Sequence, residues 1–417
     1  MTDSSGHLVE HFFRHESAHL IAVLTRAFGI RRIDLIEDMV QVAMLEAMNA
    51  WKQGGVPDNP SAWIHRAAKN RILDALRREK TLAQAISLAG PTLDVQENTV
   101  EEWLSEEQLP DSLLRMMFVC CHPTLNRETQ IALTLKTLCG FGHAEIAGGL
   151  LLPIETIRKR ITRAKRSLGE ANVAVELPCP DEIAQRRGVV HDVLYLMFNE
   201  GHSTSQGFQP IRDDICEEAA RLCHLLSESE HDSPATKALL ALMLFQAARL
   251  ESRTDQQGTV VLLEDQDRSK WDRRLITIAQ HELARSKTDT PTTYHWEAAI
   301  AMQHCIANSV EATDWEMIAG FYSRLLEIHP SPIYKLNRAI AWAQAGQTNE
   351  AMRELQVLRQ SGALQTYLLL DCAIARVHEL DDDTAKAIDT YLIALSKAKA
   401  DHEKHLIETK LQKLHRT

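Results

Sequence analysis

Apolar residues recur every three or four positions over most of this chain, and no other feature constrains its fold as strongly. Residues at that spacing lie on one face of an α-helix, whereas a half-buried strand alternates apolar and polar residues. The segments that carry the pattern are rich in Ala, Leu, Glu and Arg, and alternating β-branched runs are hard to find. The sequence therefore predicts an all-α protein.

The chain has 417 residues, which is too many for one compact core, and it separates into four segments. Breaks in the helical pattern are expected near Gly29 and over 54–60, where Gly and Pro gather. Acidic pairs and Gly90-Pro91 interrupt the pattern further along, as is typical of a linker. In chain order the segments are a helical segment (8–80), an acidic linker (81–108), a compact helical unit (109–170) and an all-helical extension (171–417).

The extension contains an internal repeat, which is clearest over 332–398. A shift of 34 residues superposes these pairs: Leu336 and Leu370, Ala339 and Ala373, Ala351 and Ala385. It places the turn inside each helix pair at Gly346 and at Leu380. A period of 34 with small residues at helix contacts is typical of tetratricopeptide repeats. Generic antiparallel helix pairs are the alternative that the pattern leaves open.

The net charge of −11 is unevenly distributed. Residues 1–170 contain 20 Lys and Arg against 21 Asp and Glu, whereas residues 171–417 contain 26 against 36. The positive charge of the first part is concentrated in two short segments, 61–78 and 158–166. Since the distribution of charge matters more than its sum for contact with nucleic acid, the first part remains a candidate for DNA binding.

The second basic segment has helix-turn-helix spacing. Ala147 is small enough for two helices to cross closely, and Pro153 suits the opening of the second helix. An apolar stripe follows at helical spacing: Ile157, Ile161, Ala164 and Leu168. Side chains around the rest of this helix are candidates for contact with DNA: Glu155, Arg158, Lys159, Arg160, Thr162, Arg163, Lys165 and Arg166. Such a helix suits a major groove, and a merely solvated basic face is the alternative.

The first basic segment, 61–78, is expected to form one helix that begins near Ser61. Its apolar face carries Ile64, Ala68, Ile72 and Ala75. The other face carries Trp63, Arg66, Asn70 and Arg77. An aromatic ring among cations and an amide is suited to capturing unstacked bases. The alternative for Trp63 is a packing residue near the start of the helix.

Several stretches of the first part together resemble the extracytoplasmic-function sigma factors, the smallest relatives of bacterial sigma-70. Residues 36–41, Ile-Glu-Asp-Met-Val-Gln, are similar to the family's region 2 stretch, and residues 62–78 are similar to its promoter-melting helix. Residues 145–165 are similar to region 4, which reads the upstream promoter box. The similarity covers residues 8–170 in the family's order and spacing. It implies region 2 over 8–80 and region 4 over 109–170.

The resemblance also implies roles for individual residues. Asp38 and Gln41 would contact core RNA polymerase. The residues that would meet the downstream promoter box are Asn70, Arg71, Arg77 and Arg78. Those that would meet the upstream box are Thr156, Arg158, Lys159, Arg160 and Arg163.

The extension resembles that of a subgroup with a tetratricopeptide-like C-terminal domain. The similar stretches are Phe118–Pro123, Leu196–Gly201 and Leu262–Asp272. The resemblance implies a fused regulator, with a protein partner as a candidate ligand of its concave surface.

Other chemistry is weakly supported. Cys120, Cys121 and His122 lack a second ligand pair at zinc-finger spacing, and buried thiols explain them better. The acidic stretch at 264–267 lacks the glycine and terminal glutamate of an EF-hand, which favours a structural role. Phosphate loops, nucleophile elbows and zinc-protease motifs do not occur. The sequence therefore predicts no enzyme, no metal and no cofactor.

The sequence also bears on location. Residues 1–10 lack the basic start and apolar core of a signal peptide, and no window approaches a membrane span. The eight cysteines contain no C-x-x-C pair. A reduced, cytoplasmic setting is expected.

These observations predict a sigma factor that binds core RNA polymerase, duplex promoter DNA upstream and melted single-stranded DNA downstream. Two alternatives remain. An ordinary dimeric helix-turn-helix regulator would bind symmetric half-sites without polymerase. A tetratricopeptide scaffold would show no salt-dependent affinity for DNA.

Overall fold

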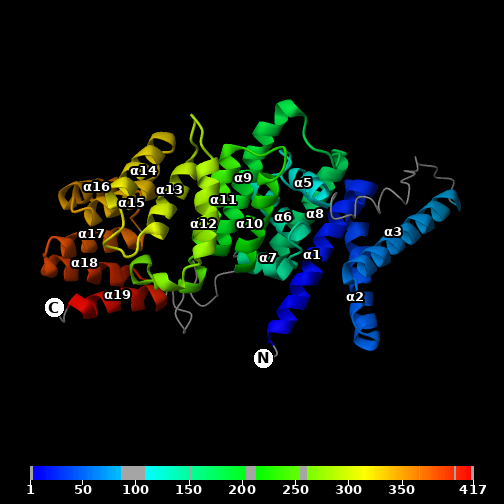
Figure 1. Ribbon diagram of the computed structural model, residues 1–417, viewed down its shortest axis with the longest axis horizontal. Helices are drawn as coiled ribbons and strands as arrows, with labels where there is room; N and C mark the ends of the chain where they lie inside the picture. The colour runs from blue at the N-terminus through cyan, green and yellow to red at the C-terminus, as the bar shows by residue number, and fades with distance from the viewer. Residues whose placement is uncertain are drawn as a thin grey trace. The chain divides into compact units, whose positions relative to one another are not determined.

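The computed structural model describes residues 3–85, 109–150, 152–202, 213–253, 261–365, 367–398 and 401–414 (Figure 1). All regular elements in these ranges are helices, which confirms the predicted all-α class. The chain divides into two compact units, residues 1–200 and 201–417. Apart from 81–85, which continue a helix, the predicted acidic linker lies outside the described residues.

The first unit opens with three long helices, α1 (Asp3–Phe28), α2 (Ile33–Gly54) and α3 (Pro60–Ala85), and a short turn, η1 (Ile30–Arg32). The breaks between them fall where they were predicted. Gly29 has a φ of +85°, a conformation that residues with a Cβ rarely adopt, and it ends α1. The Asn59 side chain accepts a hydrogen bond of 2.9 Å from the backbone N–H of Ala62 and so caps α3.

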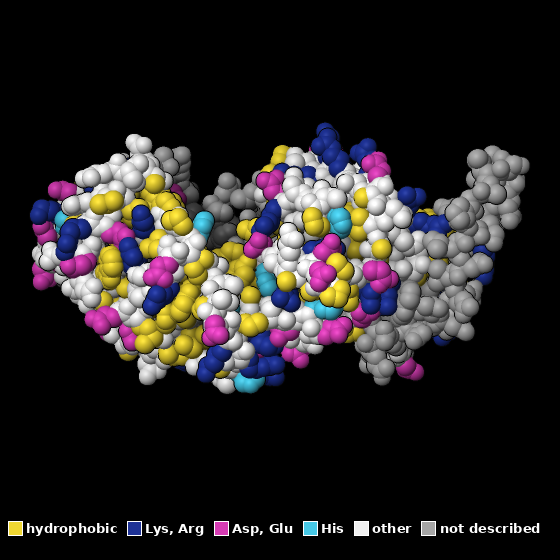
Figure 2. All heavy atoms as spheres, turned by 90° about the horizontal axis from the view of Figure 1, so that it is seen from above, with side chains coloured by type: hydrophobic (Ala, Val, Ile, Leu, Met, Phe, Trp, Pro, Cys, Tyr) yellow, Lys and Arg dark blue, Asp and Glu magenta, His cyan; other side chains and the backbone are white. Residues whose placement is uncertain are grey.

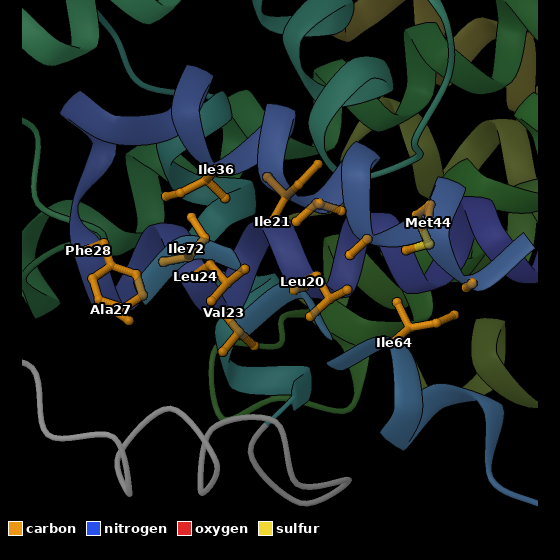
Figure 3. Close-up of a cluster of buried hydrophobic side chains, with 14 residues drawn as sticks. Leu20, Ile21, Val23, Leu24, Ala27, Phe28, Ile36, Met44, Ile64 and Ile72 are labelled. Atoms are coloured by element: carbon orange, nitrogen blue, oxygen red, sulfur yellow. The ribbon is translucent and has the colours of Figure 1, made fainter. Parts of the chain in front are cut away.

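The core of these three helices is built from their apolar faces (Figure 3). Leu20 and Leu24 of α1, Ile36 of α2, and Ile64 and Ile72 of α3 are at most 1% exposed. In Figure 3 these side chains point toward one another from the three helices. This core thus fixes the rotation of α3 about its own axis and, with it, the direction in which its polar face points.

Five further helices complete the first unit: α5 (Leu109–Cys120), α6 (Arg127–Thr137), α7 (His143–Gly149), α8 (Ile154–Glu170) and α9 (Pro180–His202). The Asn126 side chain caps α6 through a 3.0 Å bond from the N–H of Thr129. Arg186 of α9 donates to the backbone oxygen of Phe118 at 2.8 Å. The first unit therefore continues past the end of α8 to residue 200 and includes most of α9.

The second unit is a succession of helices: α10 (Asp213–Ser227), α11 (Pro234–Ala247), α12 (Arg273–Arg285), α13 (Thr293–Ile306), α14 (Trp315–Ile328), α15 (Pro332–Gln344), α16 (Thr348–Ser361), α17 (Leu368–Leu380), α18 (Thr384–Lys397) and α19 (Asp401–Leu414). Three short turns, η2 (Leu250–Ser252), η3 (Leu263–Asp265) and η4 (Arg268–Lys270), lie between α11 and α12.

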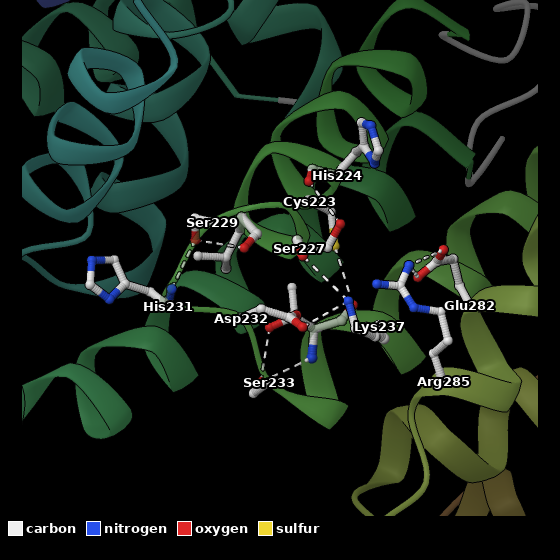
Figure 4. A network of polar contacts seen from close by, with 12 residues as sticks. Cys223, His224, Ser227, Ser229, His231, Asp232, Ser233, Lys237, Glu282 and Arg285 are labelled. Carbon is white, nitrogen blue, oxygen red and sulfur yellow. Dashed lines mark hydrogen bonds and ion pairs between the residues drawn. The ribbon is translucent and has the colours of Figure 1, made fainter. Parts of the chain in front are cut away.

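Polar contacts fix the junction of α10 and α11 (Figure 4). Lys237 forms a 2.7 Å ion pair with Asp232 and donates to the backbone oxygen of Ser227. The Ser233 hydroxyl accepts from the N–H of Thr236 and caps α11. Because Lys237 is almost fully buried, these partners satisfy a charge that would otherwise be costly to remove from water.

Helix pairs recur at the end of the unit, but the predicted spacing of 34 residues is wrong by two. The helices α15 and α17 begin 36 residues apart, and so do α16 and α18. The turns inside the two pairs confirm this register, since Gly346 and Asp382 both have positive φ. The 34-residue shift matched residue types but not burial: it pairs buried Ala351 with exposed Ala385, whereas a shift of 36 pairs it with buried Ala387. A slide of two residues turns a helix by about 200° and so exchanges its faces.

Within the described part of the chain, no helix combines the length and the apolar character that crossing a membrane requires.

Candidate nucleic-acid interface

The helix α8 is held by its apolar stripe. Ile157, Ile161, Ala164 and Leu168 are all at most 2% exposed, which confirms the face predicted from their spacing. Ala147 of α7 is also buried, and α8 contacts both α6 and α7. The first turn of α8 follows Pro153, which has extended backbone geometry. Packing on one face thus leaves the opposite face of α8 for solvent or a ligand.

That opposite face is basic. Lys159, Arg163 and Arg166 are exposed, and none of them forms an ion pair with a described residue. Thr162 is exposed between them. Three cations and a hydroxyl on one helix face match the donors that proteins use toward phosphates and base edges.

The flanks of α8 are paired within the first unit. Arg158 lies 2.8 Å from Glu155, one turn before it on the same helix. Arg160 lies 2.7 Å from Glu128 of α6 and is about one quarter exposed. Thr156 is half-buried. Exposed ion pairs contribute roughly 0–1 kcal/mol, so that a phosphate can compete for these two guanidinium groups.

Lys165 occupies a different place from the other basic residues. The helical pattern predicted Lys165 as a candidate for contact with DNA, whereas the structure shows it buried against α2. Its Nζ lies 2.8 Å from Asp34 and 2.8 Å from Glu37. Burial by itself lowers the pKa of Lys165, but the two carboxylates outweigh it and raise the pKa above its usual value. In this arrangement the ammonium group is engaged with carboxylates.

Contacts from Arg31 and Arg26 also join helices of the first unit. The Arg31 side chain donates to the backbone oxygen of Gly169 at 3.0 Å. The Arg26 guanidinium contacts Asp111 and Ser112 at 2.9 and 3.0 Å. The three helices α1–α3 and the four helices α5–α8 therefore form one packed body. No local pattern predicts these contacts, since their partners lie 85 or more residues apart in the chain.

Asp38 and Gln41 are exposed on α2. At about 100° per residue they share one face with Asp34 and Glu37, the partners of Lys165. The packed position of α8 therefore lies beside the two residues for which the family resemblance implies polymerase binding.

The predicted polar face of α3 is exposed. Its exposed members are Arg66, Asn70, Arg71, Arg77 and Arg78. Arg71 pairs with Glu46 of α2, and Arg77 lies 3.4 Å from Asp74. Neither Arg66 nor Arg78 forms an ion pair with a residue that the structure describes. The face thus offers cations and one amide along about four turns of helix.

Trp63 is half-buried and belongs to the core of α1–α3. Its ring meets that of Trp51 edge-on, with centroids 6.0 Å apart. Of the two interpretations that the sequence left open, this geometry favours packing.

A buried polar network joins the start of α3 to α1. The buried carboxylate of Glu16 on α1 accepts hydrogen bonds from Ser61 at 2.9 Å and lies 2.7 Å from His65. Burial raises the pKa of Glu16, but the hydrogen bonds from His65 and Ser61 outweigh it, so the pKa is below its usual value. This network locks the first turn of α3 onto α1, across a separation of 45 residues that carries no sequence signal.

The other chemistry considered has structural explanations. Cys120 and Cys121 are buried, and burial raises the pKa of both thiols, that of Cys121 to about 12. Asp265 lies 3.5 Å from Lys413, and Asp272 caps α12. Over the described ranges, no group of three or more His, Cys, Asp or Glu side chains is placed to hold a metal ion.

Comparison with known families divides the chain in the same order. Residues 12–81 match the family model for sigma-70 region 2, and residues 115–168 match the model for sigma-70 region 4. Residues 186–287 match a family of unknown function, DUF6596.

Curated relatives agree with these matches. An uncharacterised protein of Rhizobium meliloti (strain 1021) is 37% identical over 330 residues, which is 77% of this chain and 78% of the relative. The ECF RNA polymerase sigma factor SigG of Mycobacterium tuberculosis is 25% identical over 166 residues, which is 35% of this chain and 44% of the relative. No solved structure matches the chain.

Proposed function

The chain belongs to the extracytoplasmic-function group of the sigma-70 family and carries a C-terminal extension, and from this premise we propose that it initiates transcription at bipartite promoters. The observation that carries the proposal is the exposed basic face of α8, whose Lys159, Arg163 and Arg166 have no ion-pair partner among the described residues. A sigma factor adds specificity to a polymerase, and this chain is proposed to have no catalytic activity and no cofactor of its own.

The helix α8 reads the upstream box as duplex DNA. Lys159, Arg163 and Arg166, with Thr162 between them, enter the major groove, and Arg158 and Arg160 reach the flanking phosphates. Glu155 and Thr156 lie at the helix N-terminus, where recognition helices contact base edges.

The exposed face of α3 holds the downstream box. Arg66, Arg77 and Arg78 follow the backbone of the melted strand, while Asn70 and Arg71 contact unstacked bases. The Glu16 network keeps the first turn of this helix in place. Trp63 supports the helix from beneath.

Binding of polymerase to Asp38 and Gln41 requires access to the face of α2 that also holds Lys165. Packing of α8 against α2 has a cost in free energy. The second oxygen of the Glu37 carboxylate is buried and has no hydrogen-bond partner among the described residues. We therefore propose that α8 leaves α2 when polymerase binds, which frees Lys165 for phosphate contact.

The extension serves as a fused regulatory domain. Its paired helices, α15 with α16 and α17 with α18, are proposed to act as tetratricopeptide-like repeats that bind a protein partner.

Transcription in vitro tests the function. The purified full-length chain and bacterial core polymerase are incubated with a genomic fragment library, and the 5′ ends of the transcripts are mapped. Transcripts that start downstream of one shared bipartite sequence are expected. The double variant Lys159→Glu/Arg163→Glu should lose them, whereas Arg324→Glu/Arg353→Glu, which makes the same charge change on α14 and α16, should not.

The alternatives predict other results. A dimeric regulator would protect symmetric half-sites in the absence of polymerase. A scaffold would bind no DNA even when polymerase is present. Either result, together with the absence of discrete transcripts, contradicts the proposal.

A further inference from the structure

The second unit contains a cavity of about 450 Å³. It lies among α13, α14, α15, α17, α18 and α19 and the segment that precedes α12. Its apolar wall includes Trp315, Ile318, Tyr322, Leu336, Ile340 and Ile407. Pockets that bind small molecules commonly enclose roughly 300–1,000 Å³ and are mostly apolar with a few polar groups. Figure 2 shows hydrophobic side chains gathered over these C-terminal helices, between charged ones.

One part of the cavity wall carries charged side chains that form ion pairs. Glu264 forms an ion pair with Lys410 of α19, and both side chains line the cavity. Arg376, which also lines it, pairs with Glu379 on the same helix. These pairs lie where η3, α17 and α19 line the cavity, and each pair has no net charge.

Two buried arginines, Arg268 and Arg249, lie in another part of the cavity wall or directly behind it. Arg268 and Arg249 lie against the ring of Trp271, with guanidinium carbons 4.8 and 5.6 Å from the ring centroid. Both arginines are 8% exposed. Arg268 donates to the backbone oxygens of His304 and Ala307 at 2.8 and 2.7 Å. Neither arginine forms an ion pair with a carboxylate of the described residues, although buried charges are normally paired.

His304 lies near these two arginines. It lines the cavity beside Trp315, at a ring separation of 5.3 Å. Burial, with Arg249 and Arg268 adding to it, lowers the pKa of His304 to about 3. Its Nδ1 is buried without a hydrogen-bond partner among the described residues. Burial lowers the pKa of Arg268, and Glu311 partly offsets this but forms no ion pair with Arg268, so a neutral imidazole and two buried cations form a site that favours an anion.

We propose that this cavity binds a small amphipathic anion, a molecule with an apolar body and a single carboxylate. The carboxylate lies at Arg268, and the body lies along the wall formed by α14 and α15. A single negative charge fits because Arg268 lines the cavity, whereas Arg249 stands behind it on Trp271. The site goes beyond promoter recognition, and it would make the extension responsive to a metabolite.

Calorimetric titration of the full-length chain tests the proposal with three probes of equal chain length: decanoate, decanol and decyltrimethylammonium. Decanoate is expected to bind at one site per chain, at least tenfold more tightly than decanol, and the cation is expected not to bind. Equal binding of decanol, preference for the cation, or the absence of saturable decanoate binding would overturn the proposal. Decyl phosphate distinguishes a carboxylate site from a phosphate site, since tighter binding of the dianion contradicts the single charge.

Three single substitutions test whether decanoate binds in this cavity. Ile340→Trp should fill the cavity and weaken decanoate and decanol alike by at least tenfold. Val357→Trp, an equivalent change at a 59% exposed position on α16, should leave both unchanged. Gln344→Glu adds a carboxylate to the lining at a half-buried position and should weaken decanoate alone. Circular dichroism establishes that each variant is folded. Unchanged decanoate affinity in folded Ile340→Trp and Gln344→Glu contradicts the site.

Discussion

Lys165 of α8 and Glu37 of α2 form a buried ion pair with 2.8 Å between Nζ and Oε2, although 128 positions separate them in the sequence. Asp34 completes the site at 2.8 Å. The pair joins the helix proposed to read the upstream promoter box to the helix proposed to bind polymerase. It is therefore the contact through which stability and function of the first unit can be tested together.

Removal of Lys165 should destabilise the first unit. In Lys165→Ala the Glu37 carboxylate remains buried without its cation, which we expect to cost about 1–3 kcal/mol of the free energy of unfolding. Urea denaturation of the full chain, followed by circular dichroism, measures this cost. Arg158→Ala, which breaks an exposed pair with Glu155, is the control and should cost less than about 1 kcal/mol.

A milder change at the same position should favour binding to polymerase. Lys165→Gln weakens the contact between α8 and α2, and a larger open population raises the apparent affinity for core polymerase. We expect a several-fold lower Kd, measured by fluorescence anisotropy with labelled sigma factor. Arg166→Gln, the exposed neighbour, should leave the affinity unchanged. An equal or weaker affinity of Lys165→Gln would show that the packed state does not compete with polymerase.

The slope of promoter affinity against salt concentration should indicate how many phosphates α8 contacts. Each contact contributes about 0.9 to the slope of log K against log salt, so Lys159→Gln/Arg163→Gln should lower that slope by about 2. The measurement is a salt titration of polymerase holoenzyme on a duplex upstream box. Arg324→Gln/Arg353→Gln is the matched control. If the slope of the first variant equals that of the wild type, these residues do not neutralise phosphates.

Trp63 should matter for folding through its ring rather than through its indole nitrogen. Trp63→Phe retains an aromatic contact with Trp51 and should keep promoter opening within about twofold, whereas Trp63→Ala should lower stability by about 2–3 kcal/mol. Permanganate footprinting reports opening, and urea denaturation reports stability. A folded Trp63→Phe variant that fails to open promoters would instead indicate stacking of Trp63 on a base.

The second unit should lose stability in acid because His304 is harder to protonate in the folded chain than in the unfolded one. Its pKa is about 3 in the folded chain against an unfolded value near 6.5, so the unfolded state binds a proton first. The stability that depends on neutral His304 is fully present above about pH 6.5, and it declines as the pH falls toward 3. His304→Gln should flatten the decline in unfolding free energy between pH 7 and 5, as measured by urea denaturation. A decline as steep as that of the wild type would contradict this.

Features that depend on a few neighbouring residues could be predicted from the sequence, whereas features that depend on tertiary contacts could not. The buried stripe of α8, with Ile157 and Ile161, and the breaks at Gly29 and before Pro60 follow from helical periodicity and turn chemistry, which act within a few residues. The position of Lys165 depends on how α8 meets α2, and a local pattern contains no information about that meeting. The 34-residue register failed because it matched residue types without regard to burial. The helix starts and the turn at Asp382, each 36 residues after its counterpart, give the observed register.

The hydrogen bond from Arg186 to the backbone oxygen of Phe118 has a practical consequence for anyone who divides this protein. Arg127 of α6 also pairs with Asp192 of α9, so α9 has polar contacts with two helices of the first unit. A fragment that ends after α8 would lose both contacts and leave the Phe118 carbonyl without its donor. The natural place to cut lies near residue 200, inside the segment that sequence families assign to the extension.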